Sequence, residues 1–302
     1  MALTLNQFEI LEYLERTQNN RVTQRELAKI KYLSVGTVNK TLNELQEMEL
    51  VKTKDRNIFE VTLKGYEYLE PYRVKKAIFL AAGFGSRMVP ITLNTPKPLV
   101  LVHGKRLIDT LLDAVLAANI LDITIVRGYL GEQFDVLKKK YPMIKFVDNP
   151  LYNETNNISS IYLVRDQLQS AYVFESDLLL YNSKLIRKYE YSTNYLGIPM
   201  ERSDDWCFEV KRDYITKMKV GGENCYQMVG ISFWNDEDGR KMNQDITDVF
   251  HMPGGKEKYW DQVALDEKIE DYKIMVKKCE FFDVIEIDTF GELKKIDPIY
   301  NI

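Results

Sequence analysis

The 302-residue sequence contains few cysteines and histidines, and this scarcity excludes several kinds of site. Its three cysteines, Cys207, Cys225 and Cys279, are scattered and form no CxxC pair, which argues against a disulfide framework and against a cysteine-rich zinc site. Only two histidines, His103 and His251, are present, so acid–base or metal chemistry built on histidine has little support. We therefore expect a reduced, cytoplasmic protein.

The sequence also lacks a strong excess of charge and a long apolar run. Lys and Arg number 41 against 45 Asp and Glu, and the net charge of −4 gives no general attraction to nucleic acid or anionic membranes. No apolar run approaches the roughly 20 residues that span a bilayer. The N-terminal segment has neither the basic nor the apolar region of a signal peptide. We expect no membrane partner.

Residues 1–72 have the pattern of a small separate domain. The apolar residues of 8–14 follow a helical spacing, Thr23 and Glu26 have the spacing of a capping box, and Ser34 opens a third helix. Two short strands around the turn KDRN and a last helix follow. This order resembles a winged helix-turn-helix, in which the third helix enters the major groove of DNA.

The charge of this segment leaves its partner open. Residues 1–74 carry eleven Lys or Arg and eleven Asp or Glu, whereas DNA-binding domains usually have a basic surface. Winged helices also serve as dimerisation modules, so DNA binding and a homodimer both stay open. The residues that could form a local basic patch are Lys29, Lys31, Lys40, Lys52, Lys54 and Arg56.

A glycine turn follows the first apolar strand of the remaining chain, residues 73–302. The strand KKAIFL runs into LAAGFGSR, in which Gly83 and Gly85 allow the backbone to approach a ligand closely. The Walker A pattern GxxxxGK[ST] is absent, and a methionine stands where a dinucleotide fingerprint has its third glycine. The run LAAGFGSRMVPITLNTPKPL instead resembles the signature of the nucleotidyltransferases, with Lys97 ten residues after Arg87.

The order of elements after this turn predicts the fold. The segment 104–141 reads as a helix, a buried strand with the letters DITIVRGY, and a second helix. Strands that alternate with helices predict an α/β domain built on a mostly parallel, doubly wound sheet. Ligands of such sheets bind beyond the carboxyl ends of the strands, where the turns after Leu80 and Val126 are expected to meet.

The resemblance implies a nucleotide site around the glycine turn. Backbone N–H groups of residues 82–86 can wrap a triphosphate, and Arg87 and Lys97 become the catalytic cations. The polar segment NNISS, which begins at Asn156, resembles the base-reading part of bacterial cytidylyltransferases. The nucleotide-binding residues predicted in this way are Leu80, Ala81, Ala82, Gly83, Gly85, Ser86, Tyr129, Asn156, Asn157 and Ser159.

The resemblance also implies a magnesium site. The buried strand AYVFESD ends in acids, and members of the family hold Mg²⁺ at such a strand end. Asp177, nearest that end, is the first expected ligand. Asp288 is the second, with Glu286 two residues earlier on the same strand face. The segment DTFGEL also has the pattern of a helix N-terminus, so a capping role for these last two acids stays open.

The second substrate is predicted from tryptophans that stand beside acids. Trp206 follows Asp205, and Trp260 precedes Asp261. Aromatic faces together with carboxylates suit a quaternary ammonium group. The segments GYLGEQFD, GISFW and YWD, with the motifs above, resemble bacterial CTP:phosphocholine cytidylyltransferases over residues 75–300.

This resemblance implies that CTP and phosphocholine react with Mg²⁺ to give CDP-choline and pyrophosphate. Other phospho-acceptors, such as 2-aminoethylphosphonate or a sugar 1-phosphate, stay open. So does a DNA-binding regulator in which the transferase-like domain senses the nucleotide.

Overall fold

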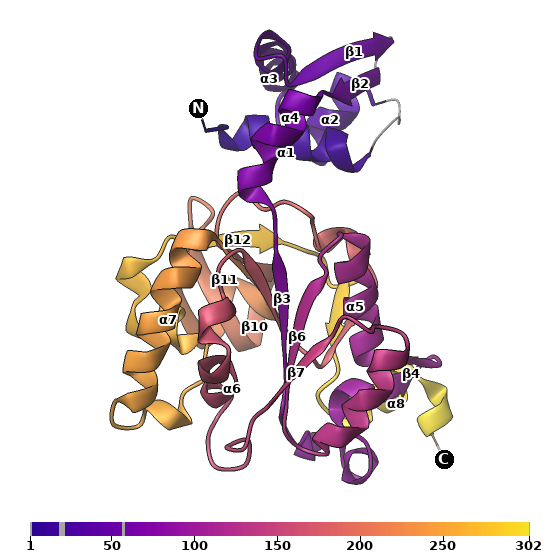
Figure 1. The fold of residues 1–302 in the computed structure, drawn as a ribbon, viewed down its shortest axis with the longest axis vertical. Coiled ribbons are helices and arrows are strands. Elements are labelled where there is room, and N and C mark those ends of the chain that lie inside the picture. The colour runs from indigo at the N-terminus through magenta and orange to yellow at the C-terminus, as the bar shows by residue number, and fades with distance from the viewer. Residues whose placement is uncertain (1, 18–21, 56–57, 302) are drawn as a thin grey trace. The chain divides into compact units, whose positions relative to one another are not determined.

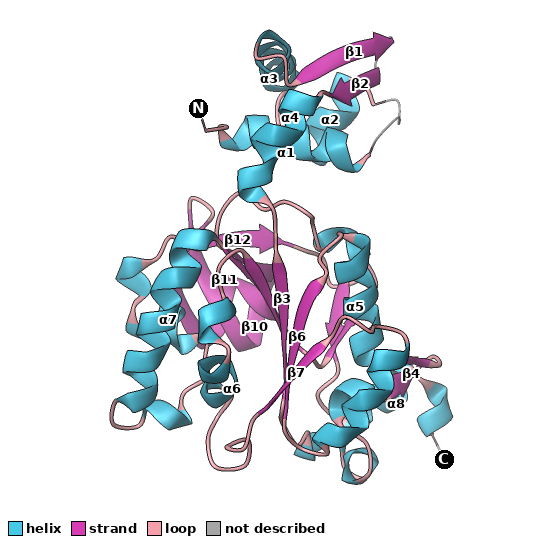
Figure 2. Ribbon diagram, in the orientation of Figure 1, coloured by secondary structure: helices cyan, strands magenta, loops and turns pink. Residues whose placement is uncertain are grey.

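The computed structural model describes residues 2–17, 22–55 and 58–301, and the chain divides into two compact units, Met1–Arg73 and Val74–Ile302. Helices and strands of both units are shown in Figures 1 and 2. None of the helices within the described ranges is long and apolar enough to cross a membrane.

The N-terminal unit has the predicted order of elements. Thr4 caps the first helix, Thr23 and Glu26 form a capping box on the second, and the Ser34 side chain caps the third, because each hydroxyl accepts a backbone N–H that the helix leaves unpaired. The winged-helix prediction is therefore confirmed in its topology. Its elements are α1 (Leu5–Arg16), α2 (Gln24–Ile30), α3 (Val35–Glu47), β1 (Val51–Asp55), β2 (Ile58–Val61), α4 (Leu63–Leu69) and a 3₁₀ turn (Glu70–Tyr72).

The predicted basic patch of this unit is smaller than the sequence suggested. The Lys31 side chain is only 7% exposed, and its ammonium lies 2.5 Å from the Glu9 carboxylate, so it is an internal ion pair and not a surface cation. Lys52 and Lys54 both pair with Glu60 on the neighbouring strand. Arg56 lies outside the described residues.

The C-terminal unit is built on a seven-stranded sheet with the order β10-β12-β11-β8-β3-β6-β7. β3 runs parallel to both β6 and β8, and β6 runs parallel to β7, whereas β11 is antiparallel to β8. The predicted α/β fold with a mostly parallel sheet is confirmed. The strands are β3 (Lys76–Ala81), β6 (Asp122–Arg127), β7 (Lys145–Asp148), β8 (Ala171–Glu175), β10 (Asn194–Lys211), β11 (Tyr214–Trp234) and β12 (Met275–Lys278).

Helices cover both faces of this sheet, with α5 on one side and α6 and α7 on the other (Figures 1 and 2). The segment after β6, expected as a helix, takes the tighter 3₁₀ form over Gly131–Lys139. The other elements are α5 (Leu107–Ala117), α6 (Ile158–Leu163), α7 (Asp236–His251), α8 (Phe290–Ile296), a π-helical turn (Val263–Glu267) and the short strands β4 (Leu101–Val102), β5 (Lys105–Arg106), β9 (Leu178–Leu180) and β13 (Val284–Glu286).

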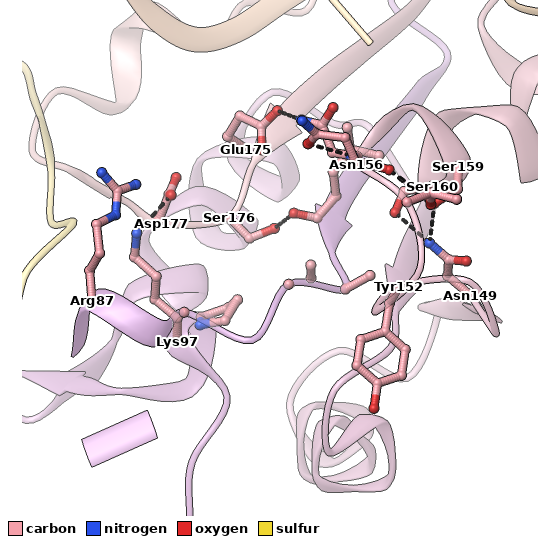
Figure 3. Close-up of a pocket in the computed structure, with 18 residues that line it drawn as sticks. Arg87, Lys97, Asn149, Tyr152, Asn156, Ser159, Ser160, Glu175, Ser176 and Asp177 are labelled. Carbon is pink, nitrogen blue, oxygen red and sulfur yellow. Dashed lines mark hydrogen bonds and ion pairs between the residues drawn. The ribbon is translucent and has the colours of Figure 1, made fainter. Parts of the chain in front are cut away.

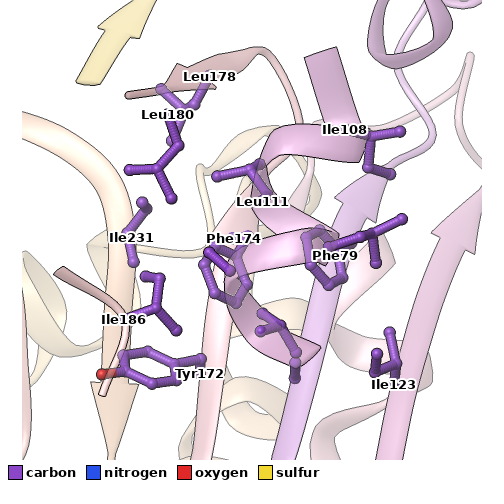
Figure 4. Close-up of a cluster of buried hydrophobic side chains, with 14 of the residues drawn as sticks. Phe79, Ile108, Leu111, Ile123, Tyr172, Phe174, Leu178, Leu180, Ile186 and Ile231 are labelled. Atoms are coloured by element: carbon purple, nitrogen blue, oxygen red, sulfur yellow. The ribbon is translucent and has the colours of Figure 1, made fainter. Parts of the chain in front are cut away.

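The central strand β3 supplies side chains to two hydrophobic cores. Ala77 and Phe79 pack with α5 on one face, and Ile78 and Leu80 pack with α6 and α7 on the other, because successive side chains of a strand point to opposite faces. In the first core the Phe79 and Phe174 rings stack with their centroids 4.6 Å apart (Figure 4). Burial on both faces fixes β3, and with it the turn that follows.

Three of the parallel strands end at the same edge of the sheet. The glycine turn follows β3, Gly128 follows β6, and Asp177 comes two residues after β8. Parallel register between these strands therefore brings the three loops together, as in other open α/β sheets.

A pair of helical glycines tests the packing around this sheet. A Cβ on Gly239 of α7 would lie 2.4 Å from the Leu168 carbonyl oxygen, whereas a Cβ on Gly291 of α8 would meet nothing closer than 3.8 Å. We expect Gly239→Ala to lower the free energy of unfolding by about 1–3 kcal/mol through overpacking. The control Gly291→Ala should raise it by up to about 1 kcal/mol through helix propensity. Urea denaturation measures both, and changes of the same sign would contradict this account.

Candidate active site

The glycine turn is held close to Lys97. Gly85 has a φ of +67°, a conformation that side chains other than glycine's rarely adopt, and a Cβ there would lie 3.1 Å from the Lys97 Cβ. The Thr92 hydroxyl donates to the Gly85 carbonyl at 2.9 Å. Lys97 itself begins a 3₁₀ turn between two prolines, which restrict its backbone.

Lys97 bridges two carboxylates from distant parts of the chain. Its ammonium lies 2.9 Å from Asp177 and 2.8 Å from Asp288, and the Arg87 guanidinium also contacts Asp288 at 2.8 Å. The Lys97 side chain is 10% exposed. Burial by itself lowers the pKa of Lys97, but the two carboxylates outweigh it and raise the pKa overall, so the ammonium stays charged.

Three acids gather at this point. β13 pairs with β9, and the Ile287 amide donates to the Asp177 carbonyl at 3.1 Å, which brings the C-terminal segment to the end of β8. Carboxylate oxygens of Asp177, Glu286 and Asp288 all lie within 4.8 Å of one another. Glu286 is exposed at the surface, yet desolvation of its carboxyl in the concave site and repulsion from the other two carboxylates raise its pKa to about 9.

This acid cluster fits a divalent cation. Asp177 Oδ1 is buried and has no hydrogen-bond partner in the part of the chain that the structure describes. A buried oxygen without a donor is costly, and a hard cation would satisfy it. Glu286 and Asp288 do not cap the following helix, because Thr289 and Glu292 form the capping box of α8.

A cavity of about 270 Å³ opens between the glycine turn and α6. Figure 3 shows Arg87, Lys97 and Asp177 at one end, and Asn149, Tyr152, Ser159 and Ser160 at the other. The charged groups at one end suit the triphosphate of a nucleoside triphosphate, and the amides and hydroxyls at the other end suit its base. The lining residues are Leu80, Ala81, Ala82, Gly83, Gly85, Arg87, Lys97, Pro98, Asn149, Tyr152, Thr155, Asn156, Asn157, Ser159, Ser160, Glu175, Ser176 and Asp177.

Two predicted nucleotide-binding residues do not line this cavity. The Tyr129 amide donates to the Ala82 carbonyl at 3.0 Å, and its ring meets the Phe84 ring edge-on at 4.5 Å. Tyr129 therefore fastens the glycine turn from outside. Ser86 begins the 3₁₀ turn Ser86–Met88 and is also absent from the lining.

Sequence reasoning missed the polar residues that follow β7. Asn149 donates from its amide to the hydroxyls of Ser159 and Ser160, at 2.9 and 3.0 Å. Tyr152 lies against Gly128, where a Cβ would come within 2.7 Å of it. Their position directly after a parallel strand was the available signal, because loops at that edge carry ligands.

A second cavity of about 240 Å³ adjoins the first. Asp205, Trp206 and Asp261 line it, and Trp206 meets Tyr259 edge-on with ring centroids 5.9 Å apart. Asn157 and Glu175 line both cavities, so the two share a wall. The full lining is Arg87, Asn157, Glu175, Asp177, Leu178, Asp205, Trp206, Met218, Met228, Gly230, Tyr259, Asp261, Glu286 and Asp288.

Trp260 corrects the predicted acceptor site. Its side chain is 1% exposed, its indole N–H donates to Glu175 at 3.2 Å, and its ring packs against Trp234. The indole thus lies behind the cavity wall, because a large apolar ring gains most from full burial. The neighbouring Tyr259, and not Trp260, lines the second cavity.

The second cavity is lined by five acidic side chains besides Asp288, and the described residues around it lack the positive charge that would keep all of them ionised. Burial, followed by the Asp261 and Asp177 charges, raises the pKa of Glu175, and burial raises the pKa of Asp261 to about 7. Arg87 is the only Lys or Arg among the described residues that line this cavity, and it is paired with Asp288. The cavity is therefore suited to a cation.

Comparison with known proteins agrees with this geometry. The nucleotidyl transferase family matches residues 76–192, and the MarR family matches residues 3–57. A 2-aminoethylphosphonate cytidylyltransferase of Lancefieldella rimae is 33% identical over 228 residues, which cover 74% of this chain and 92% of the relative. A choline-phosphate cytidylyltransferase of Streptococcus pneumoniae is 33% identical over 225 residues, covering 74% of this chain and 97% of the relative.

This chain belongs to the nucleotidyltransferase family. A solved structure of CTP:phosphocholine cytidylyltransferase from Streptococcus pneumoniae superimposes with a TM-score of 0.70 at 32% identity, over 75% of this chain and 99% of that one. The protein is thus a cytidylyltransferase for a phosphate-bearing acceptor, with a MarR-like winged helix at its N-terminus.

Removal of the Lys97 ammonium tests whether its charge stabilises the transition state of the transfer reaction. We expect Lys97→Ala to lower kcat by about 100-fold or more, because a fixed positive charge is lost where negative charge grows in the transition state. The dissociation constant for CTP should change far less, since the glycine turn still holds the triphosphate. Pyrophosphate release and calorimetry measure the two. The exposed Lys105→Ala is the control, and near-normal turnover of Lys97→Ala would contradict the assignment.

The raised pKa of Asp261 predicts how stability depends on pH. The folded carboxyl keeps its proton up to about pH 7, whereas the unfolded one loses it near pH 4. The free energy of unfolding should therefore fall as pH rises between these values. Asp261→Asn removes this titration, so denaturant titrations from pH 5 to 8 without metal or substrate should give a shallower fall than in wild type. Parallel curves would argue against a raised pKa.

Proposed function

We propose that the protein transfers the CMP moiety of CTP to phosphocholine, giving CDP-choline and pyrophosphate. The observation that carries this proposal is the cavity beside the glycine turn, which is lined by acidic and aromatic side chains. A quaternary ammonium would lie against Trp206 and Tyr259 through cation–π attraction and would compensate the charge of Asp205 and Asp261. A sugar 1-phosphate has no such cation and would leave these carboxylates without a counter-charge.

The reaction would be an in-line displacement. A phosphate oxygen of phosphocholine forms a bond to the α-phosphorus of CTP, while the bond from that phosphorus to the β-phosphate oxygen breaks and pyrophosphate leaves. The acceptor phosphate is already an anion, so no nucleophile from the protein is needed. Lys97 and Arg87 would offset the negative charge that gathers as the two phosphates approach, and the turn amides would fix the triphosphate.

Asp177, Glu286 and Asp288 would hold Mg²⁺, which would supply positive charge to neutralise the reacting phosphates. The three neighbouring carboxylates, one with a buried oxygen that has no hydrogen-bond partner among the described residues, support a divalent metal here. In the described structure Lys97 compensates two of these acids, and its flexible stem would let the ammonium turn toward a phosphate.

2-Aminoethylphosphonate is the second candidate acceptor, and the number of carboxylates favours it. A primary ammonium can donate hydrogen bonds to Glu175, Asp205 and Asp261, which a quaternary one cannot. The relative from Lancefieldella rimae is named for this acceptor.

DNA binding by the N-terminal unit stays a prediction, and so does a homodimer. The MarR match supports DNA binding, and Lys29 and Lys40 are exposed on α2 and α3. The internal pairing of Lys31 weakens the case for DNA binding.

An acceptor panel with CTP distinguishes these substrates. We expect phosphocholine to give the highest kcat/KM, and Trp206→Ala to raise its KM by about 3- to 30-fold, the range that a cation–π contact contributes. The KM for 2-aminoethylphosphonate should rise less. Phe282, which is 85% exposed and lines neither cavity, gives the control Phe282→Ala. A preference for 2-aminoethylphosphonate that Trp206→Ala leaves unchanged would overturn phosphocholine in favour of the second candidate.

A further inference from the structure

Two neighbouring asparagines tie the loop after β7 to the loop that carries Tyr259. The Asn156 amide nitrogen donates to the Glu257 carbonyl at 3.2 Å, and its backbone N–H donates to the Lys256 carbonyl at 2.8 Å. The Asn157 side-chain oxygen accepts from the Trp260 backbone N–H at 2.9 Å. We name Asn156 and Asn157 the asparagine strap.

The strap also orients its own side chains. The Asn156 side-chain oxygen accepts from the Asn157 backbone N–H at 2.8 Å. The Asn157 amide nitrogen donates to Glu175 at 3.1 Å. Each of the two side chains therefore uses its oxygen and one N–H for hydrogen bonds within the protein. These bonds, most of them to residues beside the second cavity, fix the direction in which each amide points.

The strap bonds flank Tyr259 on both sides. Glu257 is held two residues before it and Trp260 one residue after it. The Tyr259 side chain itself is 44% exposed, and its ring contact is the edge-on one with Trp206. The Tyr259 backbone N–H donates to the Gln262 side chain at 2.9 Å, so the position of Tyr259 in the acceptor cavity depends on this bond and on the flanking backbone that the strap holds.

Glu175 shows the same dependence. Asn157 and Trp260 both donate to one oxygen of this carboxylate. Gly230 provides the space for it, because a Cβ there would lie 2.5 Å from the Glu175 side chain. The strap thus fixes an acid on the wall that the two cavities share.

We propose that Asn156 and Asn157 are positioning residues for the phospho-acceptor, because they hold Tyr259 and Glu175 in the acceptor cavity. The two asparagines have this role although they themselves line the nucleotide cavity. This inference rests on the proposed function for its acceptor, and it replaces a base-reading role for Asn156.

The two roles predict a raised KM for different substrates. We expect Asn156→Ala to raise the KM for phosphocholine by about three- to tenfold, the effect of one lost hydrogen bond, with kcat and the KM for CTP within about twofold of wild type. The preference for CTP over UTP should also stay unchanged. A base-reading residue would instead raise the KM for CTP and reduce that preference, and this result would overturn the proposal.

A second variant guards against a simple loss of structure. Asn156→Asp keeps the size and the oxygen that accepts from Asn157 but loses the donor to Glu257, so it should raise the acceptor KM in the same way. Unchanged kinetics in this variant would contradict the proposal that the bond from Asn156 to Glu257 positions the acceptor cavity. Asn153 is exposed on the same loop, and its side chain makes no hydrogen bond within the described ranges, so Asn153→Ala is the matched control.

Binding measurements separate this proposal from the proposed function. Calorimetry of wild type and Asn156→Ala with phosphocholine, 2-aminoethylphosphonate and CTP gives the same comparison without turnover. An acceptor affinity that falls in the variant while the CTP affinity holds supports the strap, even if no CDP-choline forms and the proposed reaction is wrong. Equal losses for acceptor and CTP, or no acceptor binding by wild type, would overturn the strap.

Discussion

The paired contacts of Lys97 with Asp177 and Asp288 join parts of the chain that are 80 and 191 residues away from it in sequence. Lys97 lies against the glycine turn. Asp177 follows strand β8, and Asp288 follows strand β13 in the C-terminal segment. Each acid in this cluster would repel the others without a cation. The Lys97 ammonium offsets this repulsion where the carboxyl ends of β3 and β8 and the end of β13 converge, so the site and the fold depend on the same ion pairs.

Local motifs explain why much of this site could be predicted from the sequence. The glycine turn, Arg87 and Lys97 lie within one short run whose spacing carries the chemistry. Asp177 could be located because a buried apolar strand ends just before it, and parallel strands present their carboxyl ends to ligands. The alternation of strands and helices likewise predicted the parallel sheet, and capping residues predicted the helix starts of the N-terminal unit.

Side chains in irregular segments could not be predicted in the same way. Periodicity tells which face a strand or helix residue occupies, but Tyr259 and Trp260 lie in a loop, where tertiary packing alone decides which ring is buried. Tyr129 was assigned to the nucleotide, yet its hydroxyl donates to the Leu93 carbonyl and it does not line the nucleotide cavity. Asn156 does line that cavity, but its amide also donates to the distant Glu257 carbonyl, a contact that could not be foreseen from the sequence. Lys31 was counted as a surface cation because its partner Glu9 is 22 residues away in the sequence.

The shared wall of the two cavities has a consequence for the end of the reaction. Asn157 and Glu175 face both compartments, so a single molecule that contains a cytidine and a cationic head can occupy both at once. Linked ligands gain from effective concentration, since binding of one half holds the other nearby. The product of a cytidylyltransferase with a cationic acceptor has this composition, whereas each substrate fills one compartment. Such a product would have to leave both compartments together.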